Sequence, residues 1–150
     1  MSTQPNAGAA VRVTRRFSAS AERVFDAWID PEKARRWLFA TPAGEIVRAE
    51  TDPRVGGTFV FVDRRDGDAG TEDVEHVGEY LEVDRPRRLV FTFAVPRYSK
   101  ESTIVTVDIV SAGTGCELTL THERVLPEWA SKTEEGWATL LGRLAEDLGE

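Results

Sequence analysis

The chain has 150 residues, of which 41% are hydrophobic and 30% charged, and its formal net charge is −7. This length and composition fit one globular domain with a single core. The negative charge argues against nucleic-acid binding, which needs Lys and Arg to neutralise phosphates, and against attraction to an anionic membrane surface. Cys116 is the only cysteine, so no disulfide can form within the chain.

Residues 1–10 show no basic segment followed by an apolar run, so the sequence predicts no secretory signal. No window of the chain approaches the roughly 20 apolar residues that a membrane span needs. We therefore expect a cytoplasmic protein, with a flexible tail over residues 1–10 and a single domain over residues 11–150.

The first third of the chain predicts one strand and two short helices. Residues 11–17 form a β-branched run that is typical of a strand. Ser20 can cap a helix over 21–29, whose apolar face carries Val24, Phe25 and Trp28. Asp30 can cap a second helix, in which Pro31 suits the first turn and the apolar side consists of Ala34, Trp37 and Leu38.

A series of short antiparallel strands follows. Alternating or β-branched patterns predict strands over 45–50, 58–62, 74–83, 89–95, 102–110 and 116–122. The charged, glycine-containing run 63–73 predicts an exposed, flexible hairpin loop. Because the links are hairpin-sized, the pattern argues against βαβ units and a parallel sheet.

The last segment, after Pro127, predicts one long amphipathic helix whose apolar stripe consists of Trp137, Leu141, Leu144 and Leu148. An antiparallel sheet commonly buries one face and solvates the other. We expect the helix stripe to meet that buried face. The sequence thus predicts an α+β fold in which a curved antiparallel sheet wraps around the terminal helix and can enclose a cavity.

Motifs along nearly the whole chain occur in the order and spacing of a known family. They are Val13 to Phe17, Glu22 to Trp28, Asp30-Pro31, Trp37, Val55 to Phe59, Gly78 to Val83, Arg88 to Thr92, Leu118 to His122, and Gly136-Trp137 with Leu141 and Leu144. This series resembles the homologues of the activator of heat-shock protein 90 ATPase, within the START-like (SRPBCC) superfamily. The resemblance implies the helix-grip fold, whose cavity in superfamily members holds lipids, sterols, polyketides or other apolar molecules.

Several side chains are expected to line such a cavity, because strand periodicity and the helix stripe direct them inward. They are Trp28, Trp37, Phe59, Phe61, His76, Tyr80, Phe91, Phe93, Val107, His122, Trp137 and Leu141. The two histidines lack the spacing of a zinc site, and the chain has no P-loop or dinucleotide fingerprint. The sequence therefore predicts neither a metal nor a cofactor.

Three functions remain open at this point. The first is a carrier of an apolar or amphipathic small molecule, bound between sheet and terminal helix. The second is an enzyme of the polyketide cyclase or aromatase type, in which His76, Tyr80 and His122 would transfer protons. The third is an interaction protein, either a homodimer or a partner of the chaperone.

Overall fold

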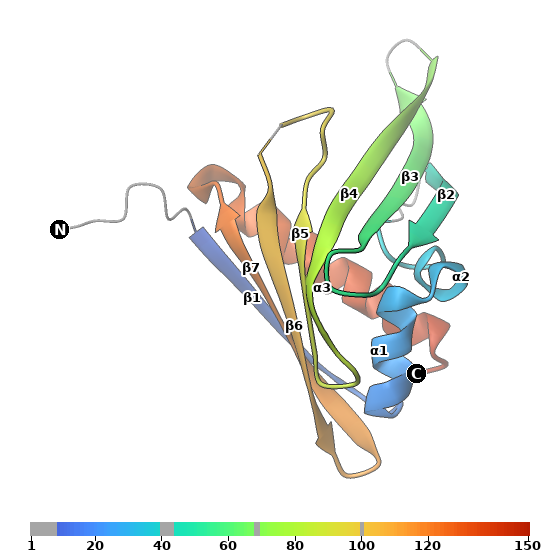
Figure 1. Ribbon diagram of the computed structural model, residues 1–150, viewed down its shortest axis with the longest axis vertical. Helices are drawn as coiled ribbons and strands as arrows, with labels where there is room; N and C mark the ends of the chain where they lie inside the picture. The colour runs from blue at the N-terminus through green and yellow to red at the C-terminus, as the bar shows by residue number, and fades with distance from the viewer. Residues whose placement is uncertain (1–8, 40–43, 68–69, 100) are drawn as a thin grey trace, which may run out of the picture.

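The computed structural model describes residues 9–39, 44–67, 70–99 and 101–150. Seven antiparallel strands form one curved sheet in the order β1-β7-β6-β5-β4-β3-β2 (Figure 1). The strands are β1 (Ala9–Phe17), β2 (Gly44–Thr51), β3 (Thr58–Gly67), β4 (Gly70–Asp84), β5 (Arg88–Phe93), β6 (Thr103–Ala112) and β7 (Gly115–Val125). The α+β class and the predicted order of elements are confirmed.

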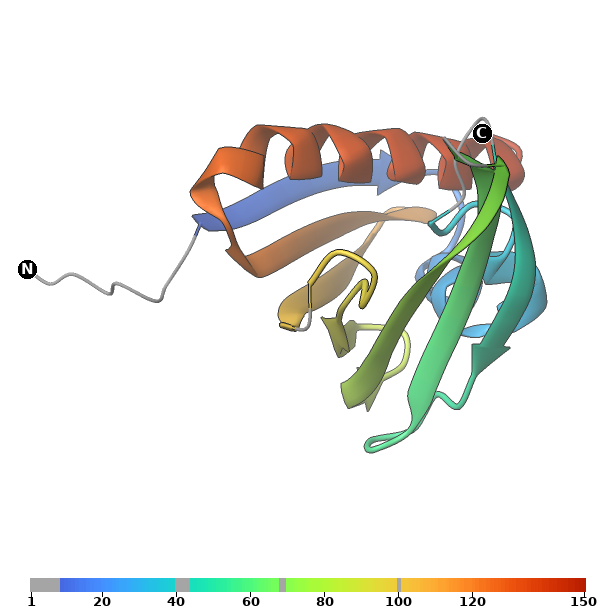
Figure 2. The same ribbon diagram turned by 90° about the horizontal axis from the view of Figure 1, so that it is seen from above.

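The helices lie on the concave side of the sheet. They are α1 (Ala21–Ile29), α2 (Pro31–Ala34), the 3-10 helix η1 (Pro127–Trp129) and the long α3 (Ala130–Asp147). Figure 2 shows α3 running along β1 and across the open side of the curved sheet. The helix α1 packs against β6 and β7, and α2 packs against β2. Sheet and helices therefore enclose a common interior.

Both predicted helix caps are present. The backbone N–H of Arg23 donates to Oγ of Ser20 at 3.2 Å, and that of Glu32 donates to Oδ1 of Asp30 at 2.9 Å. These bonds satisfy amide groups that the first turn leaves unpaired. The second helix is shorter than predicted, because α2 ends at Ala34 and the apolar residues after it lie in turns.

The prediction of a flexible loop over residues 63–73 is wrong for the residues that the structure describes there. The strands β3 and β4 pair continuously from Thr58 opposite Glu79 to Gly67 opposite Gly70. Arg64 contributes to this pairing, since its guanidinium forms two hydrogen bonds, of 2.8 and 3.1 Å, with the carboxylate of Asp73. Cross-strand pairs of opposite charge stabilise a hairpin whose composition alone indicates a loop.

The predicted tail over residues 1–10 falls outside the described residues except for its last two. Ala9 and Ala10 belong to β1, where Ala9 lies opposite Val125 of β7. The strand thus begins two residues before the predicted start at Val11.

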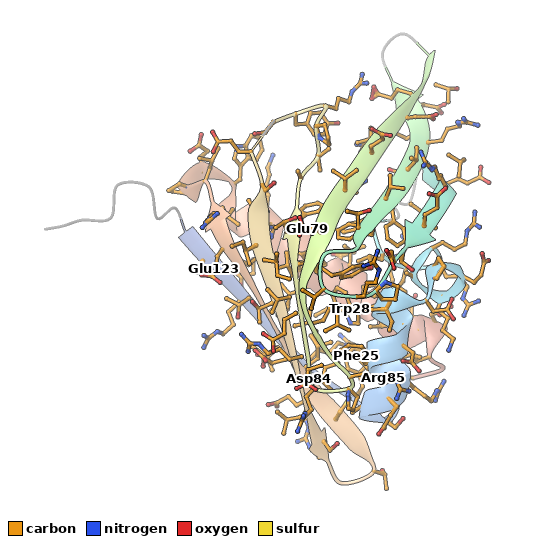
Figure 3. The ribbon with its side chains drawn as sticks, in the orientation of Figure 1. Phe25, Trp28, Glu79, Asp84, Arg85 and Glu123 are labelled. Atoms are coloured by element: carbon orange, nitrogen blue, oxygen red, sulfur yellow. The ribbon has the colours of Figure 1, made fainter. Side chains whose placement is uncertain are left out.

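The core lies between the inner face of the sheet and the three α-helices. In β6, Val105, Val107 and Ile109 point inward and are buried, as their alternation predicts. From α1, Phe25 and Trp28 extend toward the same interior (Figure 3). The α3 stripe of Trp137, Leu141 and Leu144 closes it from the opposite side. Among the described helices, none combines the length and apolar character that crossing a membrane requires.

Candidate functional site

Aromatic rings from separate elements meet around Phe39, which lies in the turn after α2. Its ring stacks nearly parallel on His76 of β4, with centroids 4.8 Å apart, and on Phe93 of β5, with centroids 5.0 Å apart. It also meets the rings of Phe61 at 5.7 Å and Trp137 at 6.1 Å in edge-on geometry. Each such ring pair adds about 0.5–1.5 kcal/mol to what burial alone contributes. Phe39 is therefore the central side chain of the interior.

The backbone of Phe39 is unusual for a residue with a side chain. Its φ angle is 60°, in the left-handed region, and such a conformation costs on the order of 1–3 kcal/mol in a non-glycine residue. The ring contacts offset this cost, and the side chain is only 6% exposed. The strained turn thus directs an aromatic ring into the space between sheet and α3.

The unfilled space that remains beside Phe39 is small. It measures about 10 Å³ and is lined by Trp28, Leu38, Phe39, Phe59, Phe61, Tyr80, Leu89 and Phe91. A cavity of this size holds one water molecule at most. A larger molecule can enter this part of the interior only when one of the lining side chains moves.

Trp28, on the inner face of α1, borders this space and carries an unusual polar group. Its side chain is 2% exposed, and its Nε1 has no hydrogen-bond acceptor among the described residues. By contrast, Nε1 of Trp37 donates to the backbone oxygen of Ala27 at 3.0 Å. Leaving a buried donor unpaired costs about 1–3 kcal/mol. The indole N–H of Trp28 is therefore a buried donor without an acceptor among the described residues.

A series of three hydrogen bonds connects Trp137 to the backbone of Phe93. Nε1 of Trp137 is 3.0 Å from Nδ1 of His122, and Nε2 of His122 is 2.6 Å from Oγ1 of Thr103. The Thr103 hydroxyl donates to the backbone oxygen of Phe93 at 3.1 Å. Both nitrogens of the imidazole are thus engaged within the protein.

Burial shifts the titration of all three candidate proton-transfer groups away from neutrality. It lowers the pKa of His122 to about 4 and also lowers the pKa of His76. It raises the pKa of Tyr80, and the nearby negative charge of Asp52 adds to that rise. Desolvation disfavours the charged form in each case. At neutral pH, the two imidazoles and the phenol are therefore uncharged.

These three side chains make no direct contact with one another in the described structure. Across the residues that the structure describes, neither a hydrogen bond nor a ring contact joins any two of His76, Tyr80 and His122. The ring of Tyr80 contacts Phe59, with centroids 5.6 Å apart, whereas the rings of His76 and His122 each contact Phe93, with centroids 6.0 and 5.8 Å away. The described residues therefore hold no hydrogen-bonded acid–base pair among these three groups.

The structure brings most of the predicted lining residues into two adjoining groups. The unfilled space borders Trp28, Phe59, Phe61, Tyr80 and Phe91. Ring contacts join His76, Phe93, His122 and Trp137 into the second group.

The other predicted residues, Trp37, Val107 and Leu141, are fully buried in the same core and do not border the unfilled space. Sequence reasoning missed four residues that matter here, namely Leu38, Phe39, Leu89 and Thr103. The apolar run of Trp37, Leu38 and Phe39 suggests that Phe39 is buried. Nothing in the sequence pattern shows that its backbone is left-handed and directs the ring into the interior.

The described part of the chain contains no set of side chains that could bind a metal ion. No group of three or more His, Cys, Asp or Glu side chains gathers there in a metal-binding arrangement. Cys116 is buried, with its Sγ 3.6 Å from the backbone oxygen of Ala19, and burial raises the pKa of its thiol. The interior is thus an aromatic and largely apolar site.

Comparison with solved structures identifies many proteins of the same fold. Protein CV1439 from Chromobacterium violaceum is 25% identical, with a TM-score of 0.77 over 92% of this chain and 96% of that chain. CalU16 from Micromonospora echinospora is 23% identical, with a TM-score of 0.69 over 92% and 74%. SA2116 from Staphylococcus aureus, described as a protein of unknown function, is 14% identical, with a TM-score of 0.81 over 97% of both chains.

No curated protein matches the chain significantly. A protein-family profile described as "Activator of Hsp90 ATPase homolog 1-like protein" matches residues 18–149, which is nearly the whole described structure. The curved seven-stranded sheet closed by α3 is the helix-grip fold that the family resemblance implies, and the solved structures share this fold. The chain belongs to this family of activator of Hsp90 ATPase homolog 1-like proteins.

Proposed function

We propose that this protein binds a small, flat, largely apolar molecule in the interior between the sheet and α3. The observation that carries the proposal is the position of Phe39, whose ring stacks on His76 and Phe93 although its backbone is left-handed. An aromatic ring is thus held where a flat ligand would sit. The ligand would replace this ring and take over its stacking contacts.

The composition of the surrounding wall supports the proposal. Small-molecule sites are mostly hydrophobic and aromatic, with a few polar groups that orient the ligand. Here the rings of Phe59, Phe61 and Phe91 supply the apolar wall, and Trp28 and His76 supply nitrogen atoms. The unpaired indole N–H of Trp28 costs stability, so a role in stabilising the core does not account for it.

The apparent affinity for a ligand depends on how readily the Phe39 ring moves out of the interior. Only molecules in which the ring has moved out can bind, so the apparent affinity is the intrinsic affinity multiplied by the fraction of such molecules. Replacing Phe39 with alanine removes this requirement and leaves a hole about the size of a benzene ring. The variant should therefore bind flat apolar compounds more tightly than the natural protein.

The experiment compares naphthalene, a flat probe, with lauric acid, a chain-shaped probe, on the natural protein, Phe39→Ala and Phe25→Ala. Phe25 is a matched control, because it is fully buried but makes no ring contact with Phe39. We expect naphthalene to raise the Tm of the natural protein and to raise that of Phe39→Ala by more. The increment in Phe25→Ala should equal that of the natural protein. Unchanged Tm values in all three proteins would overturn the proposal.

A complementary measurement identifies the natural ligand. Native mass spectrometry of the protein purified from its own host, with a denatured control, would show whether a small molecule is released on unfolding. An apolar compound at near-stoichiometric amount would support the carrier function. An empty protein whose Phe39→Ala variant also stays empty would count against it.

A chaperone partner is the second candidate, and the family description favours it. The surface offers apolar groups for such a contact, since Leu126 is 57% exposed and Trp129 is 51% exposed at the start of the terminal helix. Capture of the host's heat-shock protein 90, and loss of capture in Trp129→Ala, would support it. Sedimentation of the protein alone would show whether a homodimer forms instead.

The enzyme alternative draws little support from the geometry. Proton transfer would need His76, Tyr80 and His122 near one substrate atom, but they make no mutual contact and His122 is bonded on both nitrogens. A polyketide cyclase-like activity would therefore require a rearrangement of this interior.

A further inference from the structure

Trp28 is the one buried indole of the described structure whose N–H lacks an acceptor. The N–H groups of Trp37 and Trp137 each have a partner at 3.0 Å, and Trp129 is half exposed to water. Native proteins rarely leave a buried donor unpaired, so each exception needs a physical account.

The described surroundings of Trp28 are largely aromatic. Its ring meets Trp37 edge-on at 4.7 Å and also contacts Phe91 at 6.3 Å and Trp137 at 6.0 Å. The unfilled space that Trp28 borders is otherwise lined by apolar side chains and Tyr80. The N–H is thus buried without an acceptor, on a side chain that is packed among rings and borders the unfilled space.

We propose that the Trp28 N–H is a recognition group and that the ligand is a flat apolar molecule carrying one hydrogen-bond acceptor, such as a carbonyl oxygen. This inference rests on the proposed function, whose site it shares. An indole nitrogen donates and never accepts, so it selects acceptors over donors. Because folding has already removed the N–H from water, a ligand acceptor gains a bond with no further desolvation of the protein.

Selectivity follows from the same asymmetry. A site built to bond a polar atom rejects the analogue that lacks it, whereas a purely apolar pocket discriminates weakly. The prediction is specific to one atom of the ligand, so it can be tested with two compounds of nearly identical shape.

The test uses acetophenone and α-methylstyrene, in which a methylene group replaces the carbonyl oxygen. Dissociation constants are measured for both on the natural protein and on Trp28→Phe, and again in the Phe39→Ala background, where the interior is open. Trp28→Phe keeps an aromatic ring and removes the N–H. We expect the preference for acetophenone, relative to α-methylstyrene, to fall about five- to tenfold in Trp28→Phe. Trp129→Phe is the control and should leave the preference unchanged.

A second readout follows the Trp28 N–H directly in the natural protein. The four tryptophans give four indole N–H signals in a nitrogen–proton NMR spectrum, and the signal missing in Trp28→Phe assigns that of Trp28. Acetophenone should move this signal downfield, and α-methylstyrene should not. If Trp28→Phe does not fold, phenylalanine variants of the other three tryptophans assign the Trp28 signal by elimination, and the response of the natural protein to the two compounds decides.

The outcomes separate the two proposals. If both compounds bind and the ratio of their dissociation constants is the same with and without the Trp28 N–H, the inference is overturned and the proposed function stands. If neither compound binds even to Phe39→Ala, the proposed function fails together with the inference. A water molecule that stays on the Trp28 N–H when acetophenone is bound would also overturn the inference.

Discussion

The indole N–H of Trp137 in α3 donates a 3.0 Å hydrogen bond to Nδ1 of His122 in β7. Because this N–H can only donate, Nδ1 carries no proton, and the neutral imidazole carries its proton on Nε2. Nε2 then donates to Oγ1 of Thr103 at 2.6 Å, and the Thr103 hydroxyl donates to the backbone oxygen of Phe93. One neutral imidazole thus joins α3 to three neighbouring strands of the sheet.

The stability of the protein should therefore fall in mild acid. The pKa of His122 is about 4 when folded, against an ordinary value of 6.5. Between these values the unfolded chain binds the proton and the folded protein does not, so protonation favours unfolding. The contribution is complete above pH 6.5 and lost by about pH 4, and it amounts to about 3 kcal/mol.

Urea unfolding between pH 7.5 and pH 4.5 measures this effect, with His122→Gln as the reference that lacks this titration. The stability of the natural protein should fall more steeply than that of the variant. Parallel curves would show that the imidazole does not titrate between the two states.

Replacing Trp137 with phenylalanine should raise the pKa of His122 toward its ordinary value. The variant loses the donor that requires an unprotonated Nδ1, and the smaller ring lets water approach the imidazole. A titration of the imidazole carbon-bound proton by NMR gives the pKa directly. Trp129→Phe, at an exposed indole, is the control and should leave it unchanged. An unchanged value in Trp137→Phe would mean that burial alone lowers it.

Gly78 of β4 should not tolerate a side chain. A Cβ atom there would collide with the backbone oxygen of Thr92 and would lie 2.5 Å from ring atoms of Phe59. Gly78→Ala should therefore lower the free energy of unfolding by about 2–4 kcal/mol. In Gly136 of α3, a Cβ would meet no atom within 4 Å, so Gly136→Ala should stabilise the protein by about 0.5–1 kcal/mol. Equal effects of the two substitutions in chemical unfolding would contradict this account.

The Glu150 carboxylate should stabilise the junction between β1 and α1. Its Oε1 accepts from the backbone N–H of Ser18 at 2.7 Å, and its Oε2 accepts from that of Ala19 at 2.9 Å. Glu150→Ala should cost about 1–2 kcal/mol, because two backbone donors lose a charged acceptor. Glu146→Ala, at an exposed position of α3, should change the free energy of unfolding by less than about 0.5 kcal/mol. A Glu150→Ala protein with natural stability would show that water replaces the carboxylate at no cost.

The interior could be predicted only in part from the sequence. Inward-facing strand residues such as Phe59 and Phe61 follow from the two-residue period, and Trp137 follows from the helix stripe. Phe39 could not be predicted, because its ring enters the interior through a left-handed backbone that no local preference favours. The unpaired state of the Trp28 N–H also depends on which distant rings surround it.

The sequence by itself determined the α+β class, the strand order along the chain, the two helix caps and the apolar stripe of α3. These features depend on neighbours in the chain, and periodicity and capping chemistry express them locally. Only the tertiary structure decided that Phe39 fills the interior, that His122 pairs with Trp137, and that Arg64 and Asp73 extend the hairpin of β3 and β4. These contacts join residues brought together by the curvature and register of the sheet, which the local pattern does not encode.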